Sequence, residues 1–266
     1  MPNQPIDERP PTRLELWLGH DRASLVVLLI LFPLVCWSWI VVMAHDMYGP
    51  MTGASAWMMT LHWDASHMFL LWAMWAVMMV GMMLPSAAPL LLLYGVVVRR
   101  QSLGRTASRQ VYALAGGYAA VWALFSVGAT AAQRILSARL IVSPMMTTSH
   151  MVGAGLLIVA GVYQLTPLKL ACLQKCQSPL SVMMHRWRSG VAGAFRMGID
   201  HGAYCLGCCW ALMLLLFAGG VMHLTTIGLL TIVVLIEKTL PSESSAQWFT
   251  WASGSLLLVL AIWMLI

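Results

Sequence analysis

Charged residues are scarce in this 266-residue chain, since lysine, arginine, aspartate and glutamate together make up only 9% of it. Ordinary water-soluble domains carry about 25% charged residues. Hydrophobic residues, by contrast, make up 60% of the chain. This composition excludes ordinary packing around one water-shielded core and favours a protein whose solvent is lipid.

The chain also lacks the short motifs of several enzyme classes. It has no serine or cysteine nucleophile signature, no glycine-rich phosphate-binding loop and no apparent pair of catalytic carboxylates. Hydrolysis and nucleotide-driven transport by this chain alone are therefore not expected. The sequence leaves enzymatic activity open and favours a protein that is not an enzyme.

Long apolar runs dominate what the chain does contain. A membrane-spanning helix needs roughly 20 apolar residues, and seven segments are candidates: 22–44, 68–94, 110–132, 151–166, 204–222, 224–236 and 248–266. The fourth and sixth are short, so six spans are the alternative. The sequence predicts an all-α fold, a polytopic transmembrane helical bundle of about seven helices. Residues 1–21 are predicted to form a polar, largely disordered tail before a single transmembrane domain at 22–266.

The net charge of +6 is distributed by membrane topology and does not form a nucleic-acid-binding patch. Most basic residues lie in two connections: Arg99, Arg100, Arg105 and Arg109 in one, and Lys169, Lys175, Arg186, Arg188 and Arg196 in the other. By the positive-inside rule both connections face the cytoplasm, although Arg134 and Arg139 oppose this orientation. We expect a multi-pass protein of the bacterial inner membrane, with a cytoplasmic N-terminus, the lipid bilayer as a partner and no nucleic acid.

Five of the six cysteines and one histidine fall into two groups with helical spacing. Members of the larger group share one side of a helix around the start of the fifth segment, and members of the smaller group are four residues apart. Both groups are expected at the inner boundary of the membrane. The predicted metal ligands are His201, Cys205, Cys208 and Cys209 from the first group and Cys172 and Cys176 from the second.

These ligand types favour copper. Thiolates are soft ligands suited to Cu(I), zinc or iron–sulfur clusters, and imidazole serves both copper and zinc. The 21 methionines support Cu(I), which accepts thioethers that zinc rarely recruits. Met74, Met78 and Met82 form one row along the second segment, where packing is the competing interpretation. We expect bound copper, with zinc or no metal as alternatives.

A second group of candidate ligands is expected on the outer side of the membrane. One histidine in a loop is ordinary, but several histidines and methionines here share one depth. The candidates for this secondary site are His45, Met47, Met51, His62, His67, His150 and His223, with Met78 and Met82 lining the way inward. This layout predicts that Cu(I) is moved across the membrane or held within it, with a soluble thiol carrier as a partner.

A proline within the second predicted span and two charged residues at the end of the sixth have structural consequences. Pro85 removes a backbone donor and is predicted to bend or break the second span, with the kink facing the bundle interior. Glu237 and Lys238 lie at the inner end of the sixth segment. A mutual ion pair is the simpler prediction for them, and a functional carboxylate is the alternative.

Three stretches carry a resemblance to a known family: MMVGMMLPSAAP at 78–89, GVYQLTPLKLACLQKCQSP at 161–179 and GAYCLGCCWALMLLLFAGGV at 202–221, with Glu237 and Lys238 following. Here the chain resembles a bacterial family of unknown function described as predicted metal-binding integral membrane proteins. The resemblance implies a polytopic helical membrane protein whose suspected metal residues are Cys172, Cys176, Cys205, Cys208 and Cys209. It implies no reaction, and the outer histidines are not part of these stretches.

Other functions fit the same residues. Cys205/Cys208 and Cys172/Cys176 are pairs with which a membrane thiol–disulfide oxidoreductase works. The predicted position of these thiols near the reducing cytoplasm argues against that alternative. The chain is alternatively an accessory subunit of a larger membrane complex, or a homo-oligomer, whose cysteines hold a structural metal. Haem binding ranks last among the alternatives.

Overall fold

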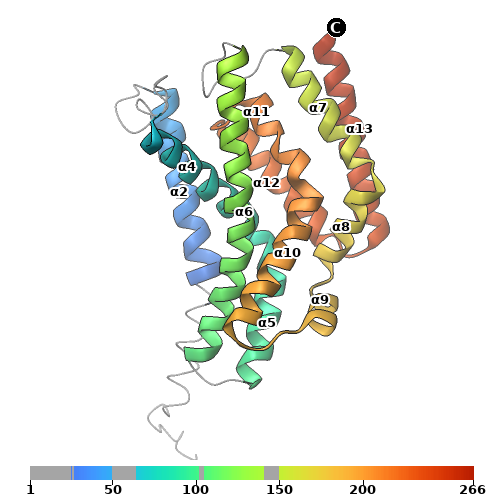
Figure 1. Ribbon diagram of the computed structural model, residues 1–266. Coiled ribbons are helices and arrows are strands. Elements are labelled where there is room, and N and C mark those ends of the chain that lie inside the picture. The colour runs from blue at the N-terminus through green and yellow to red at the C-terminus, as the bar shows by residue number, and fades with distance from the viewer. Residues whose placement is uncertain (1–24, 26, 50–63, 102–104, 141–149) are drawn as a thin grey trace, which may run out of the picture.

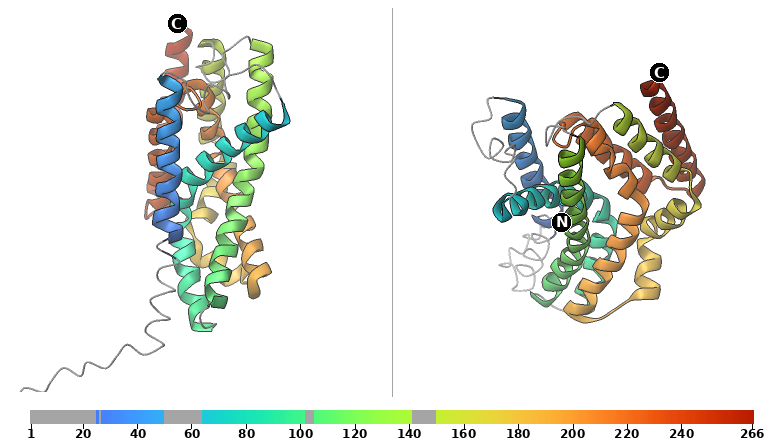
Figure 2. Two further views of the ribbon diagram at one scale, coloured as in Figure 1. Left: turned by 90° about the vertical axis from the view of Figure 1, so that its left-hand side faces the viewer. Right: turned by 45° about the horizontal axis from the view of Figure 1, so that its top comes forward.

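The computed structural model describes residues 25, 27–49, 64–101, 105–140 and 150–266. Within these ranges the regular elements are helices and no strand occurs. Most of the helices run along one long direction of the molecule (Figure 1, Figure 2). The predicted all-α helical bundle is confirmed. The predicted disordered tail at 1–21 lies outside the described residues.

The described residues form a series of helices. In chain order they are η1 (Val27–Leu31), α2 (Phe32–Tyr48), α4 (Ala65–Met83), η2 (Leu84–Ala87), α5 (Ala88–Gln101), α6 (Arg105–Leu140), α7 (His150–Gln164), α8 (Pro167–Gln177), α9 (Pro179–Arg186), α10 (Gly190–Met213), α11 (Leu215–Gly219), α12 (Leu224–Thr239) and α13 (Glu243–Leu265). Helix α10 packs against α6 and α8, and α7 packs against α13.

The described residues contain five helical segments long and apolar enough to cross a membrane: Val27–Met47, Ala65–Arg100, Thr106–Leu136, Gly190–Gly219 and Glu243–Leu265. The bent pair α7 and α8 makes a sixth if it is counted as one span. The sixth predicted segment forms α12, whose 16 residues fall short of the roughly 20 that a perpendicular crossing needs. By length and composition, the described residues therefore contain five candidate spans, or six with the bent pair, and six is the alternative number that the sequence predicted.

The second span changes its helical geometry at Pro85. The 3-10 helix η2 interrupts the span there, as predicted, because proline has no N–H for the α-helical hydrogen bond. The Met83 carbonyl accepts hydrogen bonds from the Tyr118 hydroxyl at 2.9 Å and the Ser86 hydroxyl at 2.7 Å. Leu84 and Ala87 are buried. The break faces the interior, where side chains from α6 and η2 satisfy the carbonyl.

A second break lies between α7 and α8, which meet at an angle of 66°. The Thr166 hydroxyl accepts a hydrogen bond from the Lys169 N–H at 3.4 Å, and Pro167 occupies the first turn of α8. A threonine N-cap followed by proline is a strong helix start signal. Cys172 and Cys176 consequently lie on a short helix of their own.

Helix α10 begins earlier than its apolar residues suggest. It starts at Gly190, well before residue 204, because hydropathy detects only the apolar half of the helix and misses the half that contains Arg196 and Asp200. The candidate span Gly190–Gly219 has 30 residues. Cys205 lies close to its midpoint. The thiols therefore lie near the middle of this helical segment, and their depth in the membrane stays a prediction.

Glycines let α6 and α10 approach each other closely. A Cβ atom built on Gly198 would lie 2.0 Å from the Leu114 carbonyl oxygen, and one on Gly117 would lie 2.0 Å from the Phe195 carbonyl oxygen. Backbone atoms cannot move aside as the end of a flexible side chain can. Small residues serve this purpose where helices pack in membranes. This contact sets the position of α10 and hence of its cysteines.

Replacing Gly198 with alanine should separate α6 from α10 and lower stability. Overpacking of a close contact costs about 1–3 kcal/mol, so we expect an earlier unfolding transition for the Gly198→Ala protein in detergent, followed by tryptophan fluorescence. Gly128→Ala is the matched control on α6, because its Cβ would have no neighbour within 4 Å. Equal transitions for the two variants would contradict the close contact.

The methionine row of the second span lies in the core. Met74, Met78 and Met82 are buried, as are the neighbouring Met79 and Met83. They contribute to one hydrophobic core that also contains Cys205, Cys208 and Cys209. Thioethers therefore line part of the interior in which the thiols lie.

Candidate metal centre

Three cysteines of α10 direct their side chains to one place. The Cys208 thiol donates to the Cys205 carbonyl oxygen at 3.0 Å, and the Cys209 thiol donates to the same oxygen at 2.9 Å. Residues three and four apart on a helix lie on one face, so this convergence follows from their spacing. All three cysteines are buried. Their shared face confirms the helical arrangement predicted for them.

Cys176 reaches the same place from α8. It is buried, and its thiol lies near enough to those of Cys205 and Cys208 to interact with them. Close packing of α8 on α10 produces this contact. We refer to Cys176, Cys205, Cys208 and Cys209 as the thiol cluster. The two predicted groups of cysteines therefore do meet, through one member of the smaller pair.

Cys172 lies beside the thiol cluster. Its sulfur is packed against α10, where a Cβ built on Gly207 would lie only 2.8 Å from it. The Gly207 carbonyl oxygen accepts a hydrogen bond from the Tyr163 hydroxyl at 2.5 Å, and the Tyr163 ring meets the Trp210 ring edge-on at 5.1 Å between centroids. Cys172 is half-buried. It is therefore the peripheral member of the five predicted cysteine ligands.

His201 precedes Cys205 by one turn of α10 and is also buried. Its ring centroid lies 5.9 Å from that of Tyr118. Its Nδ1 atom is buried without a hydrogen-bond partner. An unsatisfied buried polar atom costs about 1–3 kcal/mol. A nitrogen in this condition beside buried thiols fits a ligand atom for a soft metal ion.

Lys238 brings a positive charge to the thiol cluster. Its ammonium group donates to the Cys205 sulfur at 2.8 Å and to the Ser86 hydroxyl at 2.9 Å. The Tyr118 hydroxyl lies 3.0 Å from the same sulfur. Cys205 is thus the cysteine with the most polar neighbours. Sequence reasoning missed Lys238 as a site residue, although a lysine at the end of an apolar helix was a signal for one.

The predicted ion pair between Glu237 and Lys238 is wrong. Glu237 instead receives the Lys169 ammonium group, with both oxygens at 2.8 Å from its nitrogen. Consecutive residues on a helix point in directions about 100° apart, so α12 presents Glu237 to α8 and Lys238 to η2 and α10. The Gln164 amide also donates to Glu237, at 2.9 Å. Lys169 and Glu237 neutralise each other and leave the charge of Lys238 uncompensated by either.

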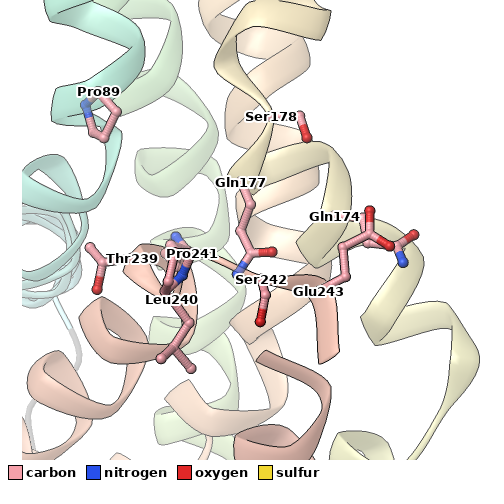
Figure 3. Close-up of a pocket in the computed structure, with 10 residues that line it drawn as sticks. Pro89, Gln174, Gln177, Ser178, Thr239, Leu240, Pro241, Ser242 and Glu243 are labelled. Atoms are coloured by element: carbon pink, nitrogen blue, oxygen red, sulfur yellow. The ribbon is translucent and has the colours of Figure 1, made fainter. Parts of the chain in front are cut away.

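A cavity of about 480 Å³ opens between α8 and the turn that joins α12 to α13 (Figure 3), and Lys238 is one of its lining residues. Its lining includes Gln174 and Gln177 from α8 and Ser242 and Glu243 from the start of α13. Figure 3 shows Gln177 projecting from α8 toward the turn between α12 and α13. Lys238 lines this cavity and also contacts Cys205, so the cavity and the thiol cluster have this residue in common.

The candidates for the secondary site do not share one environment. His45, His150 and His223 are exposed, and the His223 ring nitrogen Nδ1 lies 3.2 Å from the Thr226 hydroxyl. By contrast, His67 and Met47 are buried, as are Met78 and Met82 in the core. Met51 and His62 lie outside the described residues. The outer site remains a sequence prediction.

Across the described part of the chain, no three histidine, cysteine, aspartate or glutamate side chains are arranged so that they could hold a metal ion. The hydrogen bonds of the cysteine thiols account for the absence of such an arrangement in the described residues. Cys208 and Cys209 turn their sulfurs toward a backbone carbonyl, and the Lys238 ammonium group takes a cation's place at Cys205. Binding of a metal ion would require these side chains to rotate.

The chain is similar to one family of known proteins. A family model described as PpoB2, copper chaperone, matches residues 72–264. This range contains the thiol cluster, His201 and Lys238, and covers most of the chain. No curated protein matches the chain, and no solved structure does. The resemblance to a metal-related family is thereby confirmed, and the chain belongs to the family described as PpoB2, copper chaperone.

Proposed function

We propose that this protein is a membrane-embedded chaperone that holds Cu(I) at the thiol cluster of Cys176, Cys205, Cys208 and Cys209. The observation that carries the proposal is the convergence of four buried thiols from α8 and α10. Buried thiols in such number suit a soft ion that leaves its hydration shell readily. His201 supplies a further donor through Nδ1.

The residues around the thiol cluster favour copper over zinc as the bound metal. The core around the thiols is rich in methionine, and Cu(I) accepts thioethers. Cys205 and Cys208 are each at most 1% exposed. Exchange with a partner protein's disulfide requires an accessible sulfur, so their burial does not favour the thiol–disulfide alternative. Cu(I) is the cargo of such a chaperone and not a catalytic cofactor.

The proposal includes a location and a route. Five or six apolar helices support insertion in a bilayer, and the basic connections favour the bacterial inner membrane with a cytoplasmic N-terminus. The thiol cluster then lies within the thickness of the membrane. The cavity beside Lys238 supplies the way in from α8 and the α12–α13 turn. A soluble thiol carrier exchanges Cu(I) with the protein there, and the methionines of α4 extend the route outward.

Copper binding by the purified chain tests this function. We expect the full chain in detergent, kept reduced and without oxygen, to bind about one Cu(I) ion in competition with a chromophoric Cu(I) chelator. A variant with serine at Cys176, Cys205, Cys208 and Cys209 should lose this binding. Cys36→Ser is the control, because Cys36 is equally buried but packs against Gly81 of α4. Unchanged copper content in the four-serine variant would refute the proposal.

A further inference from the structure

We propose that Lys238 is the counter-cation of the copper site: its ammonium group neutralises the negative charge that Cu(I) acquires when two thiolates of the thiol cluster bind it. This inference rests on the proposed function and adds a residue that none of the cysteine motifs contains. It concerns affinity, since Lys238 contacts a ligand sulfur and donates no electron pair to the metal.

The geometry places one positive charge directly on the site. The Lys238 ammonium group lies 2.8 Å from the Cys205 sulfur and 2.9 Å from the Ser86 hydroxyl. Ser86 in turn lies 3.4 Å from the hydroxyl of Tyr118, which is 3.0 Å from the Cys205 sulfur. The Ser86 hydroxyl thus holds the ammonium group beside the sulfur, and the Tyr118 hydroxyl contacts both of these partners of the lysine. The direct partners of Lys238 come from η2 and α10, and α6 supplies the tyrosine that joins them.

Charge balance explains what the ammonium group does. Cu(I) with two thiolates carries one net negative charge, and a buried charge without a partner is strongly unfavourable. The nearby carboxylate of Glu237 does not cancel the charge of Lys238, because Lys169 already pairs with it. The charge of the Lys238 ammonium group and the charge of Cu(I) with its two thiolates therefore sum to zero. In the structure the same ammonium group donates a hydrogen bond to the Cys205 sulfur.

Other positive charges near the site lack this contact. Lys175 lies on α8 with its ammonium group 5.0 Å from the centre of the Tyr204 ring, and its side chain is exposed. Water screens an exposed charge, which therefore contributes little to binding in the interior. Lys175 is accordingly a control that removes one charge from the same region without removing the counter-cation.

The experiment distinguishes the contribution of the Lys238 charge to Cu(I) affinity from the contribution of its hydrogen bonds. The full chain in detergent is titrated with Cu(I) against a chromophoric chelator for the wild type, Lys238→Arg, Lys238→Gln and Lys175→Gln. Glutamine retains a hydrogen-bond donor and loses the charge, whereas arginine retains both. We expect Lys238→Gln to bind Cu(I) roughly 100-fold more weakly and Lys238→Arg to stay within about tenfold of the wild type. Lys175→Gln should bind as the wild type does.

The outcomes separate this inference from the proposed function. Wild-type affinity in Lys238→Gln, or equal losses in the arginine and glutamine variants, overturns the counter-cation while copper binding by the cysteines stands. No copper binding by the wild type overturns both. Thermal unfolding of each variant shows whether it is folded, and Lys238→Met replaces Lys238→Gln if the glutamine variant does not fold.

Discussion

Replacing Cys205 with serine should weaken Cu(I) binding by at least about 100-fold, more than any other single cysteine substitution. Loss of a residue that merely supports a metal ligand typically costs 10–100-fold in affinity, so loss of a central ligand should cost more. Cys205 is the one thiol whose sulfur contacts both Lys238 and Tyr118. Serine keeps both of these hydrogen bonds and removes only the soft donor. Competition with a chromophoric Cu(I) chelator measures the effect.

Substitutions of two other cysteines serve as comparisons for the effect of Cys205→Ser on Cu(I) affinity. Cys172→Ser should have a smaller effect, because Cys172 packs beside the thiol cluster against Gly207. Cys36→Ser should have none, since Cys36 lies on α2. A larger loss of affinity in Cys172→Ser than in Cys205→Ser would show that the centre of the site has been assigned to the wrong sulfur.

The second large effect concerns stability. Replacing Glu237 with glutamine should lower the free energy of unfolding by about 3–5 kcal/mol, because it leaves the Lys169 charge buried and unpaired. Both side chains are almost fully buried, with exposed fractions of 0% for Lys169 and 2% for Glu237. Gln164 and Gln177 also bond to Glu237, through its carboxylate and its backbone carbonyl respectively. Tryptophan fluorescence during unfolding in detergent measures the change.

Removing both charges should restore much of that loss. Replacement of a whole buried ion pair with apolar residues is often neutral, so a Lys169→Met, Glu237→Met double variant should unfold later than Glu237→Gln. Glu243→Gln provides an exposed control in the first turn of α13, where at most about 1 kcal/mol is expected. If the double variant were the least stable of the three, the pair itself would stabilise the fold.

The cysteine arrangement could be predicted from sequence because it depends on local geometry. Spacings of three and four residues determine which side chains share a face of α10, whatever the rest of the fold does. The break at Pro85 was predictable for the same reason, since proline acts on its own helix. In both cases the structure depends on the sequence of a single helix.

Lys238 was not predictable because its contacts come from distant parts of the chain. Its partner Ser86 is 152 residues away in sequence, and only the packing of α12 against η2 and α10 brings the two together. Sequence proximity favoured Glu237 as the partner, but the helical turn sends the two side chains in different directions. The same limit applies to Cys172, whose peripheral position depends on how α8 packs against Gly207.

The limits of α10 and the number of long apolar helices were predicted less well, because hydropathy reports composition alone. The polar first half of α10 is helical although it contains Arg196 and Asp200, so the cysteines lie near the middle of a longer helix than hydropathy predicts. Helix α12 is apolar but short. The outer histidine and methionine group lies partly in ranges that the structure does not describe, and it stays a prediction.

The bend of 66° between α7 and α8 divides the four sulfurs unequally. Three belong to one straight helix and keep their mutual spacing, while Cys176 belongs to a short arm attached at the Thr166-Pro167 joint. Rotation of that arm about the joint would carry away a single sulfur and leave the other three in register. The thiol cluster therefore combines three cysteines of one continuous helix with one cysteine of a separate short helix that begins at a break in the chain.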